Sequence, residues 1–230
     1  MTDNPAAGGL PSRDLVDVRL AAAIKLGGCA ICAVRARSER ATLDAIIAER
    51  VLDIGFREGL ERDHAFCRRH SAALLEADRR AAGILGSSIL FGAMIERRAA
   101  ALREAVESRG RSRRQKLAAA RRRPPCLACD QGVSGVDVAL ARLVERSGDP
   151  AWAAVMLEIP FCLDDLVALL EAGGDQASVA PIAQHHLGRL EDLRRRLDGY
   201  AHHSAQDRRH LLTDDERAAA DEAARLLAGD

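Results

Sequence analysis

The chain has 230 residues, and its 34 Lys and Arg balance its 34 Asp and Glu, giving a formal net charge of +0 at pH 7. This balance excludes a long-range attraction of the whole chain to nucleic acid or to an anionic membrane, so any such attraction has to be local. Aromatic residues make up only 3% of the chain, and the apolar positions are mostly Ala and Leu, which predicts an all-α protein.

Residues 1–12 contain two prolines and two glycines and are expected to form a disordered lead-in. The first nine residues lack the basic and apolar regions of a secretory signal. The longest apolar stretch, around residues 81–95, is interrupted by Gly and Ser and is too short to cross a bilayer. We therefore expect a cytoplasmic protein with no membrane partner.

The first module is expected over residues 13–108. A helix over about 14–25 ends at Gly27-Gly28 and leads into Cys29-Ala30-Ile31-Cys32. Apolar residues then share one helix face over 33–53, before the corner Phe66-Cys67-Arg68-Arg69-His70. From there to about 108 the helical pattern is nearly continuous, and Gly83 or Gly86 is the expected place for a bend.

Residues 109–125 are expected to be a basic linker, because eight Lys and Arg side chains crowd between Arg109 and Arg123 before Pro124-Pro125. The second module, over 126–230, opens with Cys126-Leu127-Ala128-Cys129. Asp149 is expected to cap a helix that has Pro150 at its first position, and the corner Phe161-Cys162-Leu163-Asp164-Asp165 follows. A long helix is expected over about 179–199, and the last helix opens at the capping box that starts at Thr213.

The two modules repeat one pattern. The later corners align at an offset of 95 residues (162 − 67) and the CxxC pairs at an offset of 97 (126 − 29), and all six cysteines fall in equivalent places. The pattern indicates an internal duplication, in which each helical module is stapled by a CxxC turn and an FCxx(H/D) helix start.

Each module offers three thiols and a fourth donor. Two thiolates separated by two residues can hold one metal ion from a single turn, and a second corner completes a tetrahedron that suits zinc. For the first module this predicts a site made of Cys29, Cys32, Cys67 and His70. For the second it predicts a weaker site made of Cys126, Cys129, Cys162 and Asp165, because a carboxylate is a less common zinc ligand.

Several alternatives stay open at this stage. His64 could replace His70, and Asp164, His185 or His186 could replace Asp165. The same ligands could hold an iron–sulfur cluster, or each CxxC could act as a redox dithiol, although no βαβ pattern surrounds either pair. The cysteines could also be small buried apolar residues, but six in duplicated register are more typical of metal ligands.

With both CxxC pairs and both later corners in view, the chain resembles a bacterial protein family described only as a domain of unknown function. Members show Gly-Phe-Cys-x-x-His at the first corner and Phe-Cys-Leu-Pro-His at the second. Ala65 and Asp164-Asp165 depart from that pattern here. The resemblance covers the chain from about Ala23 to the last helix and implies no activity.

For function, the sequence favours a metal-stabilised helical adaptor or regulatory protein that acts on a protein partner. We find no Ser/His/Asp set, no phosphate-binding glycine loop and no carboxylate pair at catalytic spacing, which argues against an enzyme. One alternative is nucleic-acid binding through the stretch from Arg109 to Arg123. A second is a thiol redox or iron–sulfur protein, and a third is an open metal position in the second site that activates water.

Overall fold

The computed structural model describes residues 10–81 and 83–228, and this part of the chain is all-α, as the composition predicts. Within it there is no strand, and the two β-bridges, Leu60 with His64 and Ala65 with Cys126, are isolated. Most of the expected lead-in, residues 1–9, lies outside the described residues.

The chain forms two compact units. Unit 1 holds the described residues up to Arg35 and from Gly135 onward, and unit 2 spans Ala36–Ser134. Both boundaries fall inside long helices, α2 (Ala30–Ala45) and α7 (Leu127–Arg146). This corrects the expected division into modules 13–108 and 126–230. Since neither helix contains a proline to stop it, each one continues from one unit into the other, and each unit takes parts of both sequence repeats.

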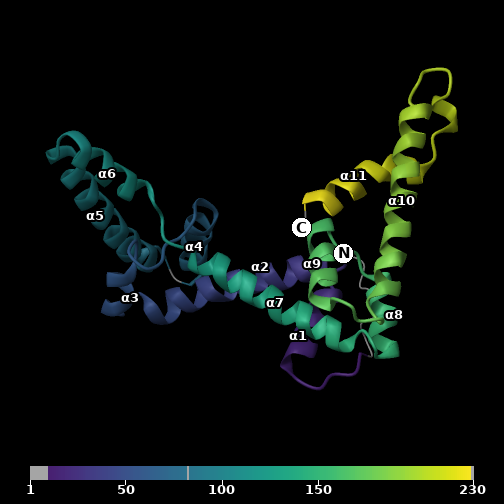
Figure 1. The fold of residues 1–230 in the computed structure, drawn as a ribbon, viewed down its shortest axis with the longest axis horizontal. Helices are drawn as coiled ribbons and strands as arrows, with labels where there is room; N and C mark the ends of the chain where they lie inside the picture. Colours follow the sequence, from purple (N-terminus) through teal and green to yellow (C-terminus); the bar gives the residue numbers. More distant parts are fainter. Residues whose placement is uncertain (1–9, 82, 229–230) are drawn as a thin grey trace. The chain divides into compact units, whose positions relative to one another are not determined.

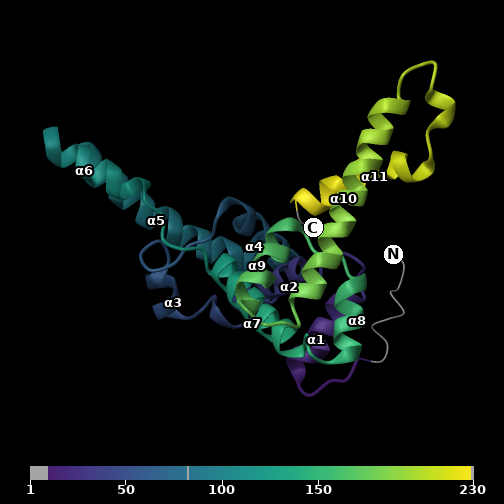
Figure 2. The same cartoon turned by 45° about the vertical axis from the view of Figure 1, so that its right-hand side comes forward.

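Unit 1 contains the start of α2, the end of α7 and the helices α1 (Leu15–Ile24), α8 (Pro150–Glu158), α9 (Leu163–Gly173), α10 (Ala180–His203) and α11 (Asp214–Ala228), with the short 3₁₀ turn η3 (Arg209–Leu211). As expected, Asp149 caps α8, and its Oδ1 accepts from the Ala151 amide at 2.9 Å. The expected capping box at α11 is also present, with Thr213 and Glu216 exchanging hydrogen bonds of 3.0 and 3.2 Å. The α11 helix packs against α10 (Figures 1 and 2).

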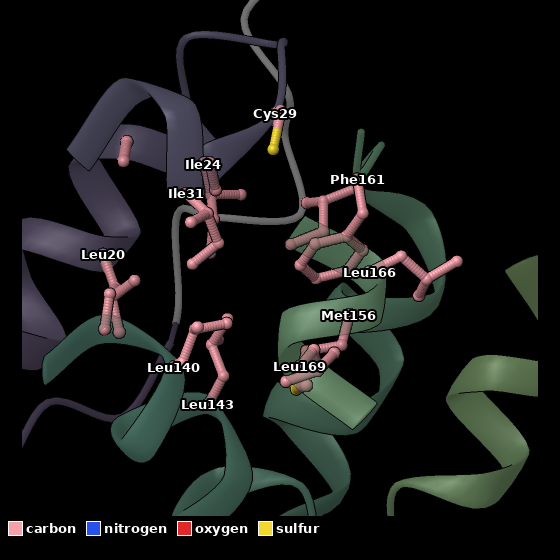
Figure 3. Packing of buried hydrophobic residues seen from close by; sticks show 14 of the residues in the cluster. Leu20, Ile24, Cys29, Ile31, Leu140, Leu143, Met156, Phe161, Leu166 and Leu169 are labelled. Carbon is pink, nitrogen blue, oxygen red and sulfur yellow. The ribbon is translucent and has the colours of Figure 1, made fainter. Parts of the chain in front are cut away.

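The core of unit 1 forms where α1, α2, α7, α8 and α9 meet (Figure 3). Trp152, Met156, Leu143 and Ile31 are fully buried in it. Phe161, the first residue of the later corner in the second repeat, is 3% exposed and belongs to the same core.

Unit 2 contains the rest of α2, the π-helical turn η2 (Ile46–Arg50) that continues it, the start of α7 and the helices α3 (Ile54–Gly59), α4 (Arg68–Ala81), α5 (Leu85–Glu107) and α6 (Gly110–Arg121). Its core gathers Leu43, Leu60, Phe66, Leu74 and Leu90, all nearly inaccessible to solvent.

Two segments of unit 2 differ from the sequence prediction or refine it. The chain bends between α4 and α5 at Gly83, whose φ of +153° favours glycine, so the expected bend lies at the first of the two candidate glycines. The expected basic linker at 109–125 is mostly the helix α6, which turns back and packs along α5 (Figure 1). The stretch around Leu117 and Ala118 has strong helix formers and no proline before Pro124, so it folds as a helix despite its charge.

The elements of the described chain follow the same order twice. Each CxxC pair opens a long helix, α2 or α7, a shorter helix follows, and each later corner opens α4 or α9 before another long helix. Among the described residues no helix has the length and apolar content needed to span a membrane.

Candidate metal centres

The eight residues expected to bind metal form two groups of four. The His70 cluster in unit 2 consists of Cys67, His70, Cys126 and Cys129, and the Asp165 cluster in unit 1 consists of Cys29, Cys32, Cys162 and Asp165. In each cluster the four ligand atoms lie within 4.8 Å of one another.

The grouping corrects the pairing expected from the sequence. We expected Cys29 and Cys32 to join Cys67 and His70 of the same repeat, but the structure joins them to Cys162 and Asp165 of the other repeat. The CxxC pair of the second repeat is likewise joined to the later corner of the first, so the two repeats exchange corners.

The lengths of the two long helices explain this exchange. Each CxxC pair lies at the N-terminus of its helix, and α2 has 16 residues while α7 has 20. At 1.5 Å per residue these helices carry the chain about 24 and about 30 Å away before the next turn. One of these long helices thus lies in the chain between each CxxC pair and the later corner of its own repeat, and the pair and that corner belong to different units.

All four corners share one local geometry. In each, a cysteine precedes the first turn of a helix and its carbonyl accepts an early helical hydrogen bond, as Cys67 does from the Ser71 amide at 2.8 Å and Cys162 from the Leu166 amide at 2.9 Å. The second donor lies three residues later on the same face of that turn. The partial positive charge at a helix N-terminus also favours anionic ligands. Each cluster receives two such helix starts.

In the His70 cluster, one imidazole nitrogen faces three sulfurs. Nδ1 of His70 lies 3.4 Å from Sγ of Cys67 and 3.3 Å from Sγ of both Cys126 and Cys129. The sulfurs of Cys67 and Cys129 are 4.0 Å apart. The other nitrogen, Nε2, lies 3.2 Å from Oε2 of the buried Glu39, within ion-pair distance but without the alignment of a hydrogen bond.

In the Asp165 cluster, one carboxylate oxygen takes the place of the imidazole. Oδ2 of Asp165 lies 3.2 Å from Sγ of Cys29 and of Cys32, and 3.1 Å from Sγ of Cys162. The sulfurs of Cys32 and Cys162 are 3.7 Å apart. Oδ1 of Asp165 accepts a hydrogen bond of 3.1 Å from the Arg35 guanidinium. Only one oxygen of Asp165 is therefore directed at the sulfurs, and the other is held by a cation.

The two clusters differ in exposure. All four residues of the Asp165 cluster are buried, whereas the three cysteines of the His70 cluster are only half-buried. Asp165 itself is 1% exposed, while its neighbour Asp164 is exposed. Asp164 is therefore not part of the cluster.

Burial also changes the acidity of the thiols. It raises the pKa of Cys29 and of Cys129 to about 12, and it raises the pKa of Cys162, where the neighbouring Asp165 adds to the effect. The pKa of Cys67 is lowered, because burial is outweighed by hydrogen bonds that include the backbone amide of His70. A cation that enters either cluster displaces protons from the thiols that hold them.

The histidines considered as alternative donors lie elsewhere. His64 stacks on Phe56, with ring centroids 4.9 Å apart, and belongs to neither cluster. Nε2 of His186 lies 2.8 Å from the carbonyl of Met156, so this ring is occupied in the core of unit 1. His185 packs against the His186 ring and joins neither cluster.

Sequence reasoning missed the two residues that contact the fourth donors. Arg35 contacts Asp165 and Glu39 contacts His70, and both lie on α2, at three and seven residues after Cys32. A helix that begins at the CxxC pair brings positions i+3 and i+7 onto the face of Cys32. This spacing could have found Arg35, whose partner Asp165 shares a cluster with Cys32, but not the contact of Glu39 with His70, which belongs to the other cluster.

Comparison of the chain with protein-family models, with curated proteins and with solved structures gives no match. The interpretation of the clusters therefore depends on their own geometry.

Proposed function

We propose that the chain is a structural zinc protein, in which one ion at each cluster closes one helical unit, and that it acts as an adaptor or regulator on a protein partner. The observation that supports this most is the spacing of the ligand atoms. A tetrahedral zinc ion with Zn–S bonds of about 2.3 Å separates two sulfurs by about 3.8 Å, and a sulfur from a nitrogen or oxygen by about 3.5 Å. The clusters have sulfurs 3.7 and 4.0 Å apart and sulfur-to-nitrogen or sulfur-to-oxygen distances of 3.1–3.4 Å.

The same distances argue against a four-iron cluster. Each thiolate of such a cluster binds a different iron, so its ligands stand farther apart than one tetrahedral edge. Ligand atoms that all lie within 4.8 Å suit one ion. A single iron ion fits the same space as zinc, and its visible absorption separates the two.

The groups behind the fourth donors support a metal at each cluster. Metal-binding imidazoles commonly direct their second nitrogen at a carboxylate, which orients the ring and raises its basicity. Glu39 occupies that position behind His70. Three thiolates and one carboxylate would leave a divalent ion with two excess negative charges, and the Arg35 guanidinium beside Asp165 offsets one of them.

Closed sites favour a structural role over catalysis. Four protein donors fill a tetrahedral zinc ion and leave no position for substrate. The adaptor role is supported by exposed apolar side chains on one face of α5, where Ile95, Leu102 and Val106 are 67, 51 and 68% exposed. Apolar groups that share one exposed face are typical of protein interaction surfaces. We place the chain in the reducing cytoplasm, where CxxC thiols remain available to metal.

Elemental analysis of the purified protein, combined with cobalt substitution, tests this proposal. We expect two zinc ions per chain, and after exchange we expect the visible and thiolate charge-transfer bands of tetrahedral cobalt. The variants Cys67→Ser and Cys162→Ser should each lose one ion and should melt at a lower temperature, because binding of zinc by a structural site contributes apparent free energies of about 10–16 kcal/mol. Absence of metal, or unchanged metal content and stability in both variants, would contradict the proposal.

Nucleic-acid binding through α6 is a second candidate. None of the α6 side chains is buried. Of the cations in residues 109–123, Lys116 pairs with Glu104 at 3.8 Å, and the others form no ion pair with the described residues. Cations without acidic partners are able to neutralise phosphates. If they do, affinity for a DNA or RNA oligomer should fall steeply with salt and should fall further in Arg113→Gln/Arg114→Gln. Binding that does not change with salt, or that both substitutions leave intact, would exclude this candidate.

A further inference from the structure

A cavity of about 240 Å³ lies in unit 1 directly beside the Asp165 cluster. Its base is formed by Cys29, Cys162 and Phe161, all buried, and Leu166 of α9 forms part of the wall. Cys29, Phe161 and Leu166 lie at one edge of the hydrophobic core (Figure 3). Well-packed interiors hold few voids larger than a water molecule, so a space of this size suits a ligand.

Two helices each contribute three residues to the cavity wall, with the same spacing. The α10 helix contributes His186, Arg189 and Leu190, and α11 contributes Glu222, Arg225 and Leu226, so both present positions i, i+3 and i+4. This spacing places the three residues of each helix on one face. The cavity therefore lies against a continuous face of each helix.

The polar groups of the cavity are arranged with positive charge at the mouth. Arg189 and Arg225 are exposed, whereas the cysteines and Phe161 are buried. Glu222 pairs with Arg196 at 2.7 Å, so its charge is compensated outside the cavity. Among the described residues Arg225 has no recorded ion pair, and Arg189 makes one long hydrogen bond of 3.4 Å to a backbone carbonyl. Both guanidinium groups are available to an anion.

We propose that this cavity binds a small organic anion, a carboxylate on a short apolar or aromatic body. Guanidinium groups bind carboxylates through paired, charge-assisted hydrogen bonds, and the leucine and phenylalanine walls suit an apolar body. By proportion to the cavity of about 150 Å³ that holds benzene, the space accepts about ten non-hydrogen atoms. The carboxylate points to the mouth, because an ion held by three thiolates and Asp165 makes the base negative. This orientation rests on the metal occupancy proposed above, while the cavity and its arginines do not.

Calorimetry on the metal-loaded protein tests the proposal with phenylacetate and its neutral counterpart of matching size, phenylacetamide. We expect phenylacetate to bind in a saturable manner with one site per chain, and phenylacetamide to bind at least about tenfold more weakly, because the charged hydrogen bonds are lost. Arg189→Met/Arg225→Met should lower the affinity for phenylacetate by a similar factor and leave the affinity for phenylacetamide unchanged. Arg194→Met, an exposed position on the same helix α10, is the matched control and should bind as the wild type does.

A second pair of variants tests the location. Leu190→Trp fills the cavity and should remove binding of both probes. If that variant does not fold, Leu226→Trp fills the cavity from α11 and serves as its replacement. Circular dichroism and metal content, measured on the same samples, show whether fold and metal are retained. Absence of saturable phenylacetate binding to the wild type, equal affinity for the amide, or undiminished binding in a folded Trp variant would overturn the proposal. Failure of the metal proposal would appear separately, as missing zinc in the wild type.

Discussion

Removing the cation behind Asp165 should weaken metal binding at one cluster alone. The Arg35 guanidinium donates to Oδ1 of Asp165 at 3.1 Å and leaves Oδ2 to face the sulfurs. In Arg35→Met, Oδ1 of Asp165 loses its hydrogen-bond donor, so the carboxylate is free to rotate. The two excess negative charges of the metal-loaded cluster then stay uncompensated. Substitutions of this kind behind a metal ligand lower affinity by about 10–100-fold. We expect a loss of affinity toward the lower end, about tenfold or about 1.4 kcal/mol of binding free energy, because the Arg35 side chain is 41% exposed and water screens its charge.

The assay is competition for zinc with a chromophoric chelator, in a Cys67→Ser background that removes the other site. Arg37→Met is the matched control, since Arg37 lies on the same helix, is exposed and has no recorded partner in the described chain. The same change there should alter affinity by less than about twofold, within the scatter of surface substitutions. Equal affinity in Arg35→Met and Arg37→Met would refute the role assigned to Arg35.

Two further predictions concern buried charges in unit 1. Asp17 is fully buried against the equally buried Arg146, so Asp17→Asn should lower the free energy of unfolding, measured in urea, by about 3–5 kcal/mol because it leaves that guanidinium uncompensated; a loss below about 1 kcal/mol would contradict this. Asp165→His alone should not strengthen its metal site, since the imidazole would face Arg35. Asp165→His/Arg35→Glu places a carboxylate beside the imidazole, as Glu39 lies beside His70, and should bind zinc more tightly than the wild type in chelator competition. A single variant that binds as tightly as the double one would show that the group behind the donor does not matter.

The members of the two clusters could be predicted from the sequence, since they are the eight residues that the repeated spacing indicated. A gap of two residues places both donors of a corner across the first turn of a helix, and this is a local property.

The pairing of the corners could not be predicted in this way. The offsets of 95 and 97 residues identify the equivalent corners of the two repeats, but they do not determine which corners form a cluster together. The partner depends on where α2 and α7 end, and the periodicity over 33–53 indicates a helix without fixing which corners it separates. The basic stretch around Lys116 was interpreted from its charge as a linker, although its alanines and Leu117 favour the helix that the structure contains.

Metal counts in two double variants test the exchanged corners most directly. Cys29→Ser/Cys162→Ser changes one cluster twice, so after dialysis against a mild chelator it should retain one zinc ion per chain, in the His70 cluster. Cys29→Ser/Cys67→Ser changes each cluster once and should retain none. If the first double variant loses both ions and the second keeps one, each repeat binds metal with its own corners, and the exchange of corners between the repeats is wrong.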